Sequence, residues 1–596
     1  MNDQKNTLLF IALSAVILIG WQVFFGLPQM EKQKLQQQQQ QTTPTTTTTP
    51  GSPPVPGEGS TPAPAPAPLT REAALAQSPR VAVQTPRVAG SIALKGGRID
   101  DLALTQYRET IDPNSPPIVL LSPSGSPQPF YAEFGWLPAP AVTVKRPDEN
   151  TVWTQQGTGA LTVDHPVVLA YDNGEGLEFR RTITVDDKYL FTVRDEVFNK
   201  GSAPVALHAF ALISRHGTPK LEGFYILHEG LIGVLNDKLQ EDTYADIEKK
   251  KTIQFPSTSG WLGITDKYWA ATLLPDPALK FQAQFSAYVN GIKRYQTLYY
   301  LDPVTIAPGA SAAATARLFA GAKEVSVVEA YKDALGLDRF DKVIDWGYFH
   351  FITKPLFITM DWIYHRVGNF GLAILLITVL IKILFFPLAN KSYASMAKMK
   401  AVQPEMVAIR ERYADDKMKQ QQAMMELYKK EKINPVAGCL PILIQIPVFF
   451  ALYKVLFITI EMRQQPFFGW IKDLSAPDPT TIFNLFGLIP WDPTVVPLIG
   501  PFLHLGAWPL VMGVTMWFQM KLNPPPPDPT QKMIFDWMPV IFTFMLAGFS
   551  AGLVIYWAWN NTLSVLQQSV IMQKHGAKVE LFDNIKKMFA KKSVKD

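Results

Sequence analysis

Long apolar stretches occur in two separate parts of the chain, and the first lies at its start. Residues 7–27 are 21 positions without a charge, enough for a helix that rises about 1.5 Å per residue to cross a hydrocarbon core of about 30 Å. A secretory signal peptide is the alternative, but this run is longer than the apolar part of a signal and lacks an A-x-A-like cleavage site. We therefore interpret residues 1–27 as an uncleaved transmembrane anchor.

The other apolar stretches begin more than 340 residues later. They predict transmembrane helices at 370–390, 436–460 and 497–520. A last stretch, 537–573, has 37 uncharged positions and as one helix would reach about 55 Å, too long for a single span. Gly548 and Gly552 lie near its middle, where glycine breaks helices. We therefore predict two short spans there, and six transmembrane helices in total: one anchor and a core of five.

Lysine and arginine in the connecting loops predict the orientation of these helices, because both residues concentrate on the cytoplasmic side. The loop at 391–435 holds ten of them and the tail at 574–596 holds seven, whereas 461–496 holds two. The first two segments and the short loop at 521–536 are then cytoplasmic, and 461–496 lies on the far side. With six spans, the N-terminus and C-terminus are both cytoplasmic and residues 28–369 are outside.

The segment between the anchor and the core is polar and changes character along its length. Residues 28–80 are rich in Gln, Thr and Pro and predict a disordered linker, because they cannot bury enough apolar surface to fold. From 81 to 335, short β-branched and aromatic runs such as 189–193 alternate with turn residues. This pattern predicts a large antiparallel β-sandwich. Residues 336–369 mix aromatic and basic side chains, which favours an amphipathic helix at the outer membrane interface or a helix packed on the sandwich.

Composition narrows the class of protein. Charged residues make up 18% of the chain and the mean hydropathy is +0.05, which argues against a wholly soluble and a wholly membranous protein. The one cysteine, Cys439, excludes a disulfide scaffold or a cysteine-based metal cluster. The histidines have no recognisable metal spacing, and no Walker-type nucleotide motif occurs. We therefore expect no metal and no cofactor.

Lys382 is the strongest candidate for a functional side chain. A cation inside a span costs about 2.5–3.5 kcal/mol on insertion scales, so it normally faces a wet cavity or a partner; the alternative is that it extends toward the cytoplasmic end of its helix. No Asp or Glu lies in the predicted core spans, which argues against a proton-coupled transporter. The neutral polar residues available to it are Thr378, Gln445, Gln519, Ser550, Asn560, Asn561, Gln567 and Gln568. We infer a hydrated groove that attracts a polar or acidic segment of another chain.

The loop at 391–435 predicts two charged helices that are rich in methionine. Flexible methionines suit a surface that accepts varied apolar partners, although the same residues could pack the seam between the two helices. The candidate partner surface consists of Met396, Met399, Met406, Met424 and Met425. The basic tail at 574–596 can bind anionic lipid or ribosomal RNA by charge alone.

Several motifs together resemble the YidC membrane protein insertases, the YidC/Oxa/Alb family, in their Gram-negative form with a large periplasmic domain. The motifs are Asn434–Phe449 (NPVAGCLPILIQIPVF), Ser395–Lys400 followed by Gln403 and Pro404, Asp473–Pro479, and Met538–Thr543. The resemblance extends over essentially the whole chain. It implies a multi-pass α-helical protein of the bacterial inner membrane whose residues 81–335 form a periplasmic all-β supersandwich.

The resemblance also implies a function and a site. The function would be that of a membrane protein insertase and folding chaperone, not an enzyme, working alone or with the Sec translocon. The family's groove cation falls on Lys382, where many relatives have arginine, and its substrate-contacting aromatics fall on Tyr556 and Trp557. With Thr378 and Gln445, these residues are the candidate substrate groove. The implied partners are nascent membrane proteins, the ribosome, the Sec translocon (SecYEG and SecDF), the lipid bilayer and the signal recognition particle receptor.

Two other functions are open to the sequence. One is a small-solute transporter with a sugar-binding outer domain, although no inverted repeat is present. The other is an outer sandwich that acts as an enzyme on cell-wall sugar. Deleting residues 81–335 would distinguish them, because an insertase core would keep its activity. The segment at 480–507 is longer than expected and receives no assignment.

Overall fold

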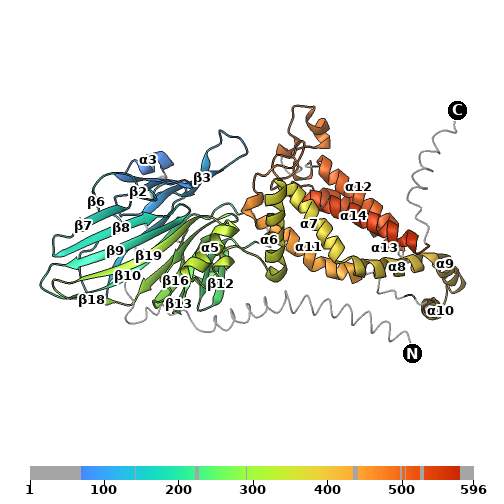
Figure 1. The fold of residues 1–596 in the computed structure, drawn as a ribbon, viewed down its shortest axis with the longest axis horizontal. Coiled ribbons are helices and arrows are strands. Elements are labelled where there is room, and N and C mark those ends of the chain that lie inside the picture. Colours follow the sequence, from blue (N-terminus) through green and yellow to red (C-terminus); the bar gives the residue numbers. More distant parts are fainter. Residues whose placement is uncertain are drawn as a thin grey trace. The chain divides into compact units, whose positions relative to one another are not determined.

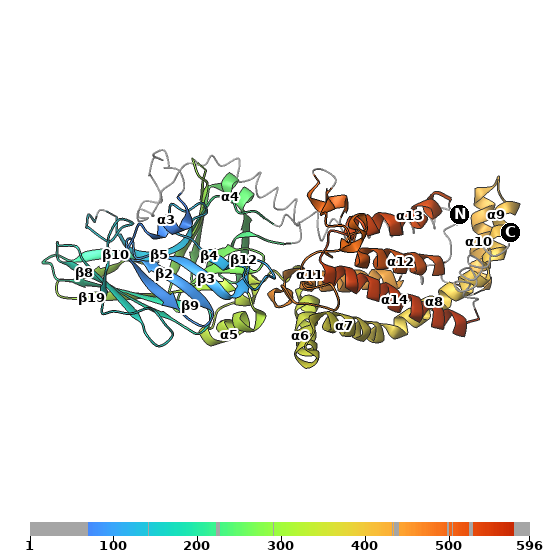
Figure 2. The same ribbon diagram turned by 90° about the horizontal axis from the view of Figure 1, so that it is seen from above.

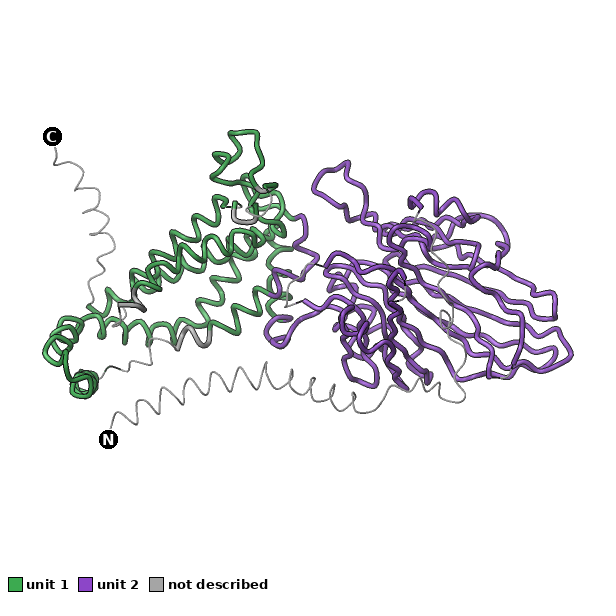
Figure 3. The backbone as a smooth tube through the Cα atoms, turned by 180° about the vertical axis from the view of Figure 1, so that it is seen from behind, with its two compact units in different colours: residues 1–48, 355–453, 465–596 green, residues 49–354, 454–464 purple. Residues whose placement is uncertain are grey.

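The computed structural model describes residues 69–140, 142–221, 227–289, 291–431, 433, 440–496, 500–503, 505–523 and 529–576. The predicted anchor, most of the predicted linker and most of the tail lie outside these residues. The described chain divides into two compact units, which Figure 3 colours separately. Unit 2 comprises residues 49–354 and 454–464, and unit 1 comprises 1–48, 355–453 and 465–596.

Unit 2 is built on two antiparallel sheets, so the predicted antiparallel sandwich is confirmed (Figure 1). Among the described residues, one sheet contains ten strands: β1 (Arg80–Gln84), β2 (Val88–Ala93), β3 (Ile99–Arg108), β4 (Pro117–Leu121), β5 (Phe130–Pro138), β10 (Val205–His216), β13 (Thr252–Ser257), β16 (Phe281–Tyr288), β17 (Arg294–Leu301) and β18 (Val304–Ile306). The other contains nine in the same part of the chain: β6 (Thr154–Gln156), β7 (Val167–Asp172), β8 (Leu177–Val185), β9 (Leu190–Asn199), β11 (Gly230–Leu235), β12 (Lys238–Thr243), β14 (Gly260–Thr265), β15 (Trp269–Leu274) and β19 (Ser311–Ala322). Short helices accompany the sheets: α3 (Arg71–Leu75), α4 (Tyr244–Lys250), α5 (Val325–Leu335) and the 3₁₀ turn η2 (Phe340–Val343).

The two sheets are joined by a buried arginine. Arg181 on β8 alternates inward with its apolar neighbours and is 1% exposed. Its guanidinium pairs with both oxygens of Asp195, opposite it on β9, at 2.7 and 2.8 Å. It also donates to the carbonyl oxygens of Gly97 and Phe134, at 2.7 and 2.6 Å, and Phe134 lies on β5 of the other sheet. Each of the three guanidinium nitrogens therefore has an acceptor, which offsets the cost of burying the charge.

The folded part begins earlier than the linker prediction of 28–80 allows. Thr70 caps α3 by accepting a hydrogen bond from the backbone N–H of Ala73 at 3.2 Å. Arg71 forms an ion pair with Asp101, and Ala74 is buried. Residues 71–80 are thus ordered by contacts with distant strands, which a compositional argument does not detect.

A buried charge network lies where residues 454–464 join unit 2. Lys454 is 7% exposed, and its Nζ donates to Asp345 Oδ2 at 2.7 Å. Burial opposes the charged form of Asp345, but Lys454 and the N–H of His228 (2.9 Å) hold its pKa below the usual value. Glu461 adds a second link by accepting from the N–H of Val325 at 2.9 Å.

Lys323 belongs to the same network and makes the free energy of unfolding of unit 2 depend on pH in the alkaline range. It is 5% exposed and donates to Thr265 Oγ1 at 2.9 Å. Burial lowers its pKa from 10.5 to about 8, against neighbouring carboxylates that raise it. Between those two values the unfolded chain holds a proton that the folded chain has lost, so the free energy of unfolding rises with pH in this window.

We expect this rise to disappear in Lys323→Met. From pH 8 to pH 10 the wild-type unit should gain about 2 kcal/mol relative to the variant. Proteolysis of the full chain across a urea series at the two pH values measures this difference. An identical pH slope in both proteins would show that Lys323 does not carry the effect.

Unit 1 is helical and is seen from above in Figure 2. Its described helices are α6 (His350–Val367, which begins in unit 2), α7 (Phe370–Leu384), α8 (Phe386–Ala401), α9 (Gln403–Arg412), α10 (Lys417–Lys430), α11 (Leu440–Ile458, which ends in unit 2), α12 (Ala507–Leu522), α13 (Pro529–Leu546) and α14 (Ala551–Lys574). Short 3₁₀ turns are η4 (Ile460–Met462, in unit 2), η5 (Ile482–Gly487), η6 (Pro493–Val495) and η7 (Gly500–Leu503). Helix α14 contacts α7, α8 and α12, and α12 also contacts α13.

Helix lengths differ from the predicted spans. Within the described residues, no single helix is both long and apolar enough to cross a membrane alone, while the bent pair of α7 and α8 meets the same test. The helix predicted at 370–390 breaks at Phe385, and its two halves meet at 68°. Pro387 explains the new start, since proline lacks an N–H and suits the first turn of a helix. Lys382 therefore lies in the last turn of α7, before the bend.

Two further boundaries move for local reasons. Helix α12 starts at Ala507 and not at 497, because Gly506 is extended and the buried carboxylate of Asp478 accepts from the N–H of Trp508 at 2.9 Å. Helix α13 starts at Pro529, within the predicted 521–536 loop. The helix is interrupted between α13 and α14, close to Gly548 and Gly552. There the N–H groups of Ala551 and Gly552 donate at 2.7 and 2.9 Å to backbone carbonyls of the 473–479 motif.

Helices α12 and α13 pack closely at a glycine. A Cβ at Gly513 would overlap Thr543 Oγ1 on α13, a hydroxyl that donates to the Pro539 carbonyl at 2.7 Å. Gly513→Ala should therefore destabilise the helical unit by about 1–3 kcal/mol, although alanine is intrinsically the better helix former. Adding Thr543→Ala removes the overlapping atom and should restore most of the loss. Thermal unfolding of the four proteins of this double-mutant cycle measures the coupling, and additive effects would contradict the contact.

Candidate functional site

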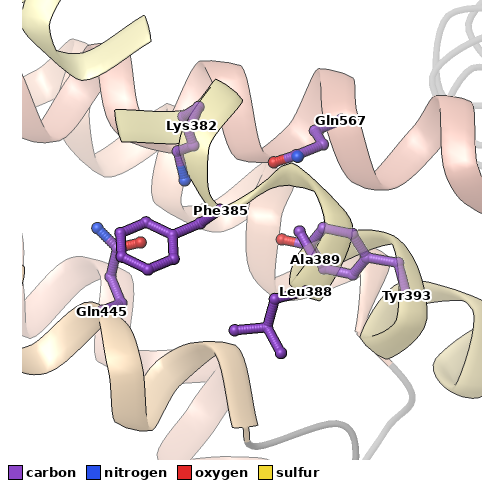
Figure 4. A pocket seen from close by; sticks show the side chains of 7 residues that line it. All are labelled: Lys382, Phe385, Leu388, Ala389, Tyr393, Gln445 and Gln567. Carbon is purple, nitrogen blue, oxygen red and sulfur yellow. The ribbon is translucent and has the colours of Figure 1, made fainter. Parts of the chain in front are cut away.

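A small polar pocket lies inside unit 1 beside Lys382. Figure 4 shows its lining side chains, which come from α7, α8, α11, α14 and the break at Phe385: Lys382, Phe385, Leu388, Ala389, Tyr393, Gln445 and Gln567. The cavity has a volume of about 40 Å³, more than a single water molecule needs. One cation, two amides and the phenol of Tyr393 face a wall that is otherwise apolar, so the pocket has polar partners for water.

The ammonium of Lys382 is positioned by a hydrogen bond to a serine hydroxyl. Its Nζ donates to Ser564 Oγ on α14 at 2.8 Å, and Ser564 Oγ donates in turn to the Asn560 carbonyl at 2.8 Å. No carboxylate of the described residues forms an ion pair with Lys382. The positive charge is positioned but not neutralised, so its field remains available to a ligand in the pocket.

Helix α14 carries further polar side chains close in sequence to Ser564, the partner of Lys382. Asn561, Ser564 and Gln568 are spaced by three and four residues and are all buried, so they share one face of the helix. Gln568 donates to Asn523 Oδ1 at 3.1 Å. Asn560 Oδ1 and Asn561 Nδ2 are buried without a hydrogen-bond partner among the described residues. Such atoms require water or a bound polar group.

The predicted groove residues do not all reach the pocket. Thr378, one turn before Lys382, is 1% exposed and its hydroxyl donates to the Ile374 carbonyl of its own helix at 2.7 Å. Tyr556 is also 1% exposed and shares a hydrogen bond with Gln445. Tyr556 thus contacts Gln445, which lines the pocket, but is not itself part of the lining.

Trp557 packs with aromatic neighbours. Its ring stacks on Phe449 of α11, with centroids 5.7 Å apart and planes 18° apart, and meets Phe549 edge-on at 5.9 Å. It borders the buried cluster formed by Met512, Leu546, Val554 and Ala558. In this structure the side chain packs α14 against α11.

Comparisons with known proteins place the chain in a family. Residues 80–359 match the family model described as the YidC periplasmic domain, and residues 362–578 match the one described as 60Kd inner membrane protein. The chain belongs to the YidC family. Curated relatives are the membrane protein insertases YidC of Bradyrhizobium diazoefficiens, 64% identical over 615 residues and the full length of both chains, and of Rhizobium meliloti, 53% identical over 597 residues and 99% of each chain. A solved structure described as an active YidC insertase with the first transmembrane domain resolved shares 17% identity over 82% of this chain and 91% of its own, with a TM-score of 0.33.

Most methionines of the predicted partner surface pack inside the α9–α10 hairpin or beside it. Met406 is buried in the seam between α9 and α10, where Met399 and Met424 pack beside it. Met396 is also buried, and Met425 is half-buried. The alternative, that methionines pack the seam, describes at least three of the five. Among the described methionines of the 391–435 segment, Met418 is the most exposed, at 59%.

Sequence reasoning missed Ser564, the residue that binds Lys382. A serine in an apolar helix is common and attracts no notice by itself. The signal that could have identified it is the polar spacing Asn560, Ser564 and Gln567/Gln568, which repeats every three to four residues along one helix. Tyr393 was missed because it lies beyond the predicted end of the span.

Proposed function

We propose that this chain is a membrane protein insertase and folding chaperone of the bacterial inner membrane, acting without covalent chemistry. The observation that carries the proposal is the pocket of unit 1. It contains a positioned ammonium, Lys382, with no carboxylate among the described residues to neutralise it. Full-length relatives that carry the name membrane protein insertase support the same reading.

The pocket would act by solvating polar segments of the substrate, which the hydrocarbon core of the membrane excludes. Moving a polar or acidic segment through a bilayer is costly because it loses its hydration. A fixed cation with amides and water around it offsets part of that cost. Lysine provides a compact charge without the planar fork of arginine, so the proposed role is field and hydration and not bidentate recognition.

The apolar segment of the substrate would leave along α7. Leu380, Ile383 and Leu384 flank Lys382 in sequence and are 48%, 64% and 73% exposed. Being one or two positions from Lys382 along the helix, they form an apolar face on the side of α7 that points away from the pocket. A nascent helix would pack against this face in lipid once its polar flank has passed the pocket.

The topology and partners belong to this proposal. We place six spans in the membrane, both termini in the cytoplasm and unit 2 in the periplasm. The α9–α10 hairpin and the basic tail would meet the ribosome and the signal recognition particle receptor, and the Sec translocon would share substrates. A solute transporter receives no support, since the relatives are named insertases.

Reconstitution tests the proposal. The purified full chain is placed in liposomes, and a short membrane protein is translated in the presence of these vesicles. Insertion is measured as protection of the translocated segment from added protease. We expect protection with the chain present and only background protection in empty liposomes. Equal protection in both would contradict an insertase function.

A further inference from the structure

Residues 482–495 form a loop before α12 that turns its apolar side chains outward, and we call it the 482–495 loop. Seven of these side chains are between 40% and 82% exposed: Phe483, Leu485, Phe486, Leu488, Ile489, Trp491 and Val495. Between 480 and 507 the only titratable residues are Asp492 and His504. A contiguous exposed apolar group of this kind marks an interaction site. The proposed insertion step does not use it.

The polar side chains of this segment are used internally. Asn484 Oδ1 accepts from the N–H of Gly487 at 2.9 Å, and Asn484 Nδ2 donates to the Trp491 carbonyl at 3.1 Å. Thr481 Oγ1 donates to the Leu503 carbonyl at 2.7 Å. The N–H of Ile482 donates to the Leu505 carbonyl at 3.0 Å. An ordinary surface loop turns polar groups to water; this loop has the opposite arrangement.

The backbone is strained where the apolar side chains are presented. Leu485 and Phe486 have φ values of 51° and 58°, in the left-handed region that bulky L-residues avoid. These two consecutive residues both adopt the left-handed conformation. A hydrogen bond from the Phe486 N–H to the Thr481 carbonyl, at 2.8 Å, holds the backbone in this turn. Strain of this kind persists only where surrounding contacts impose it, and it is a reason to look for a function.

We propose that the 482–495 loop inserts its apolar side chains into the interfacial layer of the outer leaflet of the membrane. This rests on the proposed function, which puts 461–496 on the periplasmic side beside the membrane. The loop leads into α12, an apolar helix that begins at Ala507, and it projects from the end of unit 1 where α12 starts (Figure 1).

The chemistry of the loop fits lipid better than a protein partner. Tryptophan, phenylalanine and leucine are the side chains that anchor at the membrane interface. Trp470 and Phe468, nearby in sequence, are also exposed, at 46% and 56%. A specific protein interface needs a polar rim for register and selectivity, and this loop offers one acidic residue. The loop would fix the depth of α12 relative to the outer headgroups.

Lipid-quenching of a single label tests this assignment. Cys439→Ser removes the one cysteine, and Leu488→Cys places an environment-sensitive NBD label at the most exposed position of the loop, where the side chain is 82% exposed. Ile292→Cys, 55% exposed on unit 2, is the matched control. Both labelled full-length chains are reconstituted in phosphatidylcholine vesicles with and without doxyl-labelled lipid.

We expect a blue-shifted emission at residue 488 and quenching by doxyl lipid several-fold stronger than at residue 292. Water-like emission with equal quenching at both positions would overturn the proposal. So would a label that becomes shielded only in native membranes, because that result points to a protein partner. The insertion assay keeps the two proposals separate: a chain that inserts substrate with an unquenched loop contradicts only the lipid anchor, and a quenched loop without insertion contradicts only the insertase function.

Discussion

Lys382→Glu reduces insertion of a substrate with an acidic translocated tail to less than about a tenth of the wild-type rate, a change in barrier of at least about 1.4 kcal/mol. The substitution replaces the attractive field of the pocket by a repulsive one at the point where the acidic segment passes. It also removes the donor to Ser564. Lys382→Arg keeps the charge and should retain most activity. The protease-protection assay in liposomes measures all three proteins.

A matched variant separates the pocket from general electrostatics. Lys391 is exposed on α8, nine residues beyond Lys382, and Lys391→Glu makes the same change in net charge outside the pocket. We expect near wild-type insertion from it. Equal losses in the two variants, or normal insertion of acidic substrates by Lys382→Glu, would contradict the role given to the pocket.

Arg181→Ala destabilises unit 2 by about 3–5 kcal/mol, because it leaves the carboxylate of Asp195 buried and without its partner. The carbonyls of Gly97, between β2 and β3, and of Phe134, on β5 of the other sheet, lose their donor as well. Limited proteolysis of the full chain in a urea series reports the unfolding of this unit. If the insertion activity resides in unit 1, insertion by the intact protein under native conditions should change little.

The neighbouring arginine is the control. Arg180 has a side chain that is 44% exposed and pairs with Glu178 at 3.3 Å, so Arg180→Ala should change the free energy of unfolding by less than about 0.5 kcal/mol. Similar midpoints for the two variants would contradict the importance of the buried pair.

The features that the sequence predicted correctly are those that short stretches of neighbouring residues reveal. Alternating β-branched and aromatic runs predicted the sandwich, and a charge in an apolar stretch singled out Lys382. Each strand run, and the apolar stretch around Lys382, can be recognised from neighbouring residues alone. The structure then places Lys382 at the end of α7, because Pro387 restarts the helix and bends the chain by 68°.

The remaining features depend on contacts between distant parts of the chain. Lys454 pairs with Asp345, 109 residues away, and Lys382 binds Ser564, 182 residues away. No periodicity connects such positions. Met406 and Met424 were ambiguous for a related reason: a methionine pattern is the same whether it faces a partner or the neighbouring helix, and only the packed hairpin decides between them.

The central claim is that the pocket beside Lys382 receives the substrate, and site-specific photocrosslinking tests it most directly. A photoreactive amino acid is placed at Gln567, which lines the pocket, or at Val514 on α12, which is 54% exposed. Each protein is then irradiated with ribosome-bound nascent chains of a membrane protein. We expect crosslinks from residue 567 and few from residue 514, although residue 514 is exposed. Crosslinks from residue 514 alone, or equal crosslinks from both, would contradict it.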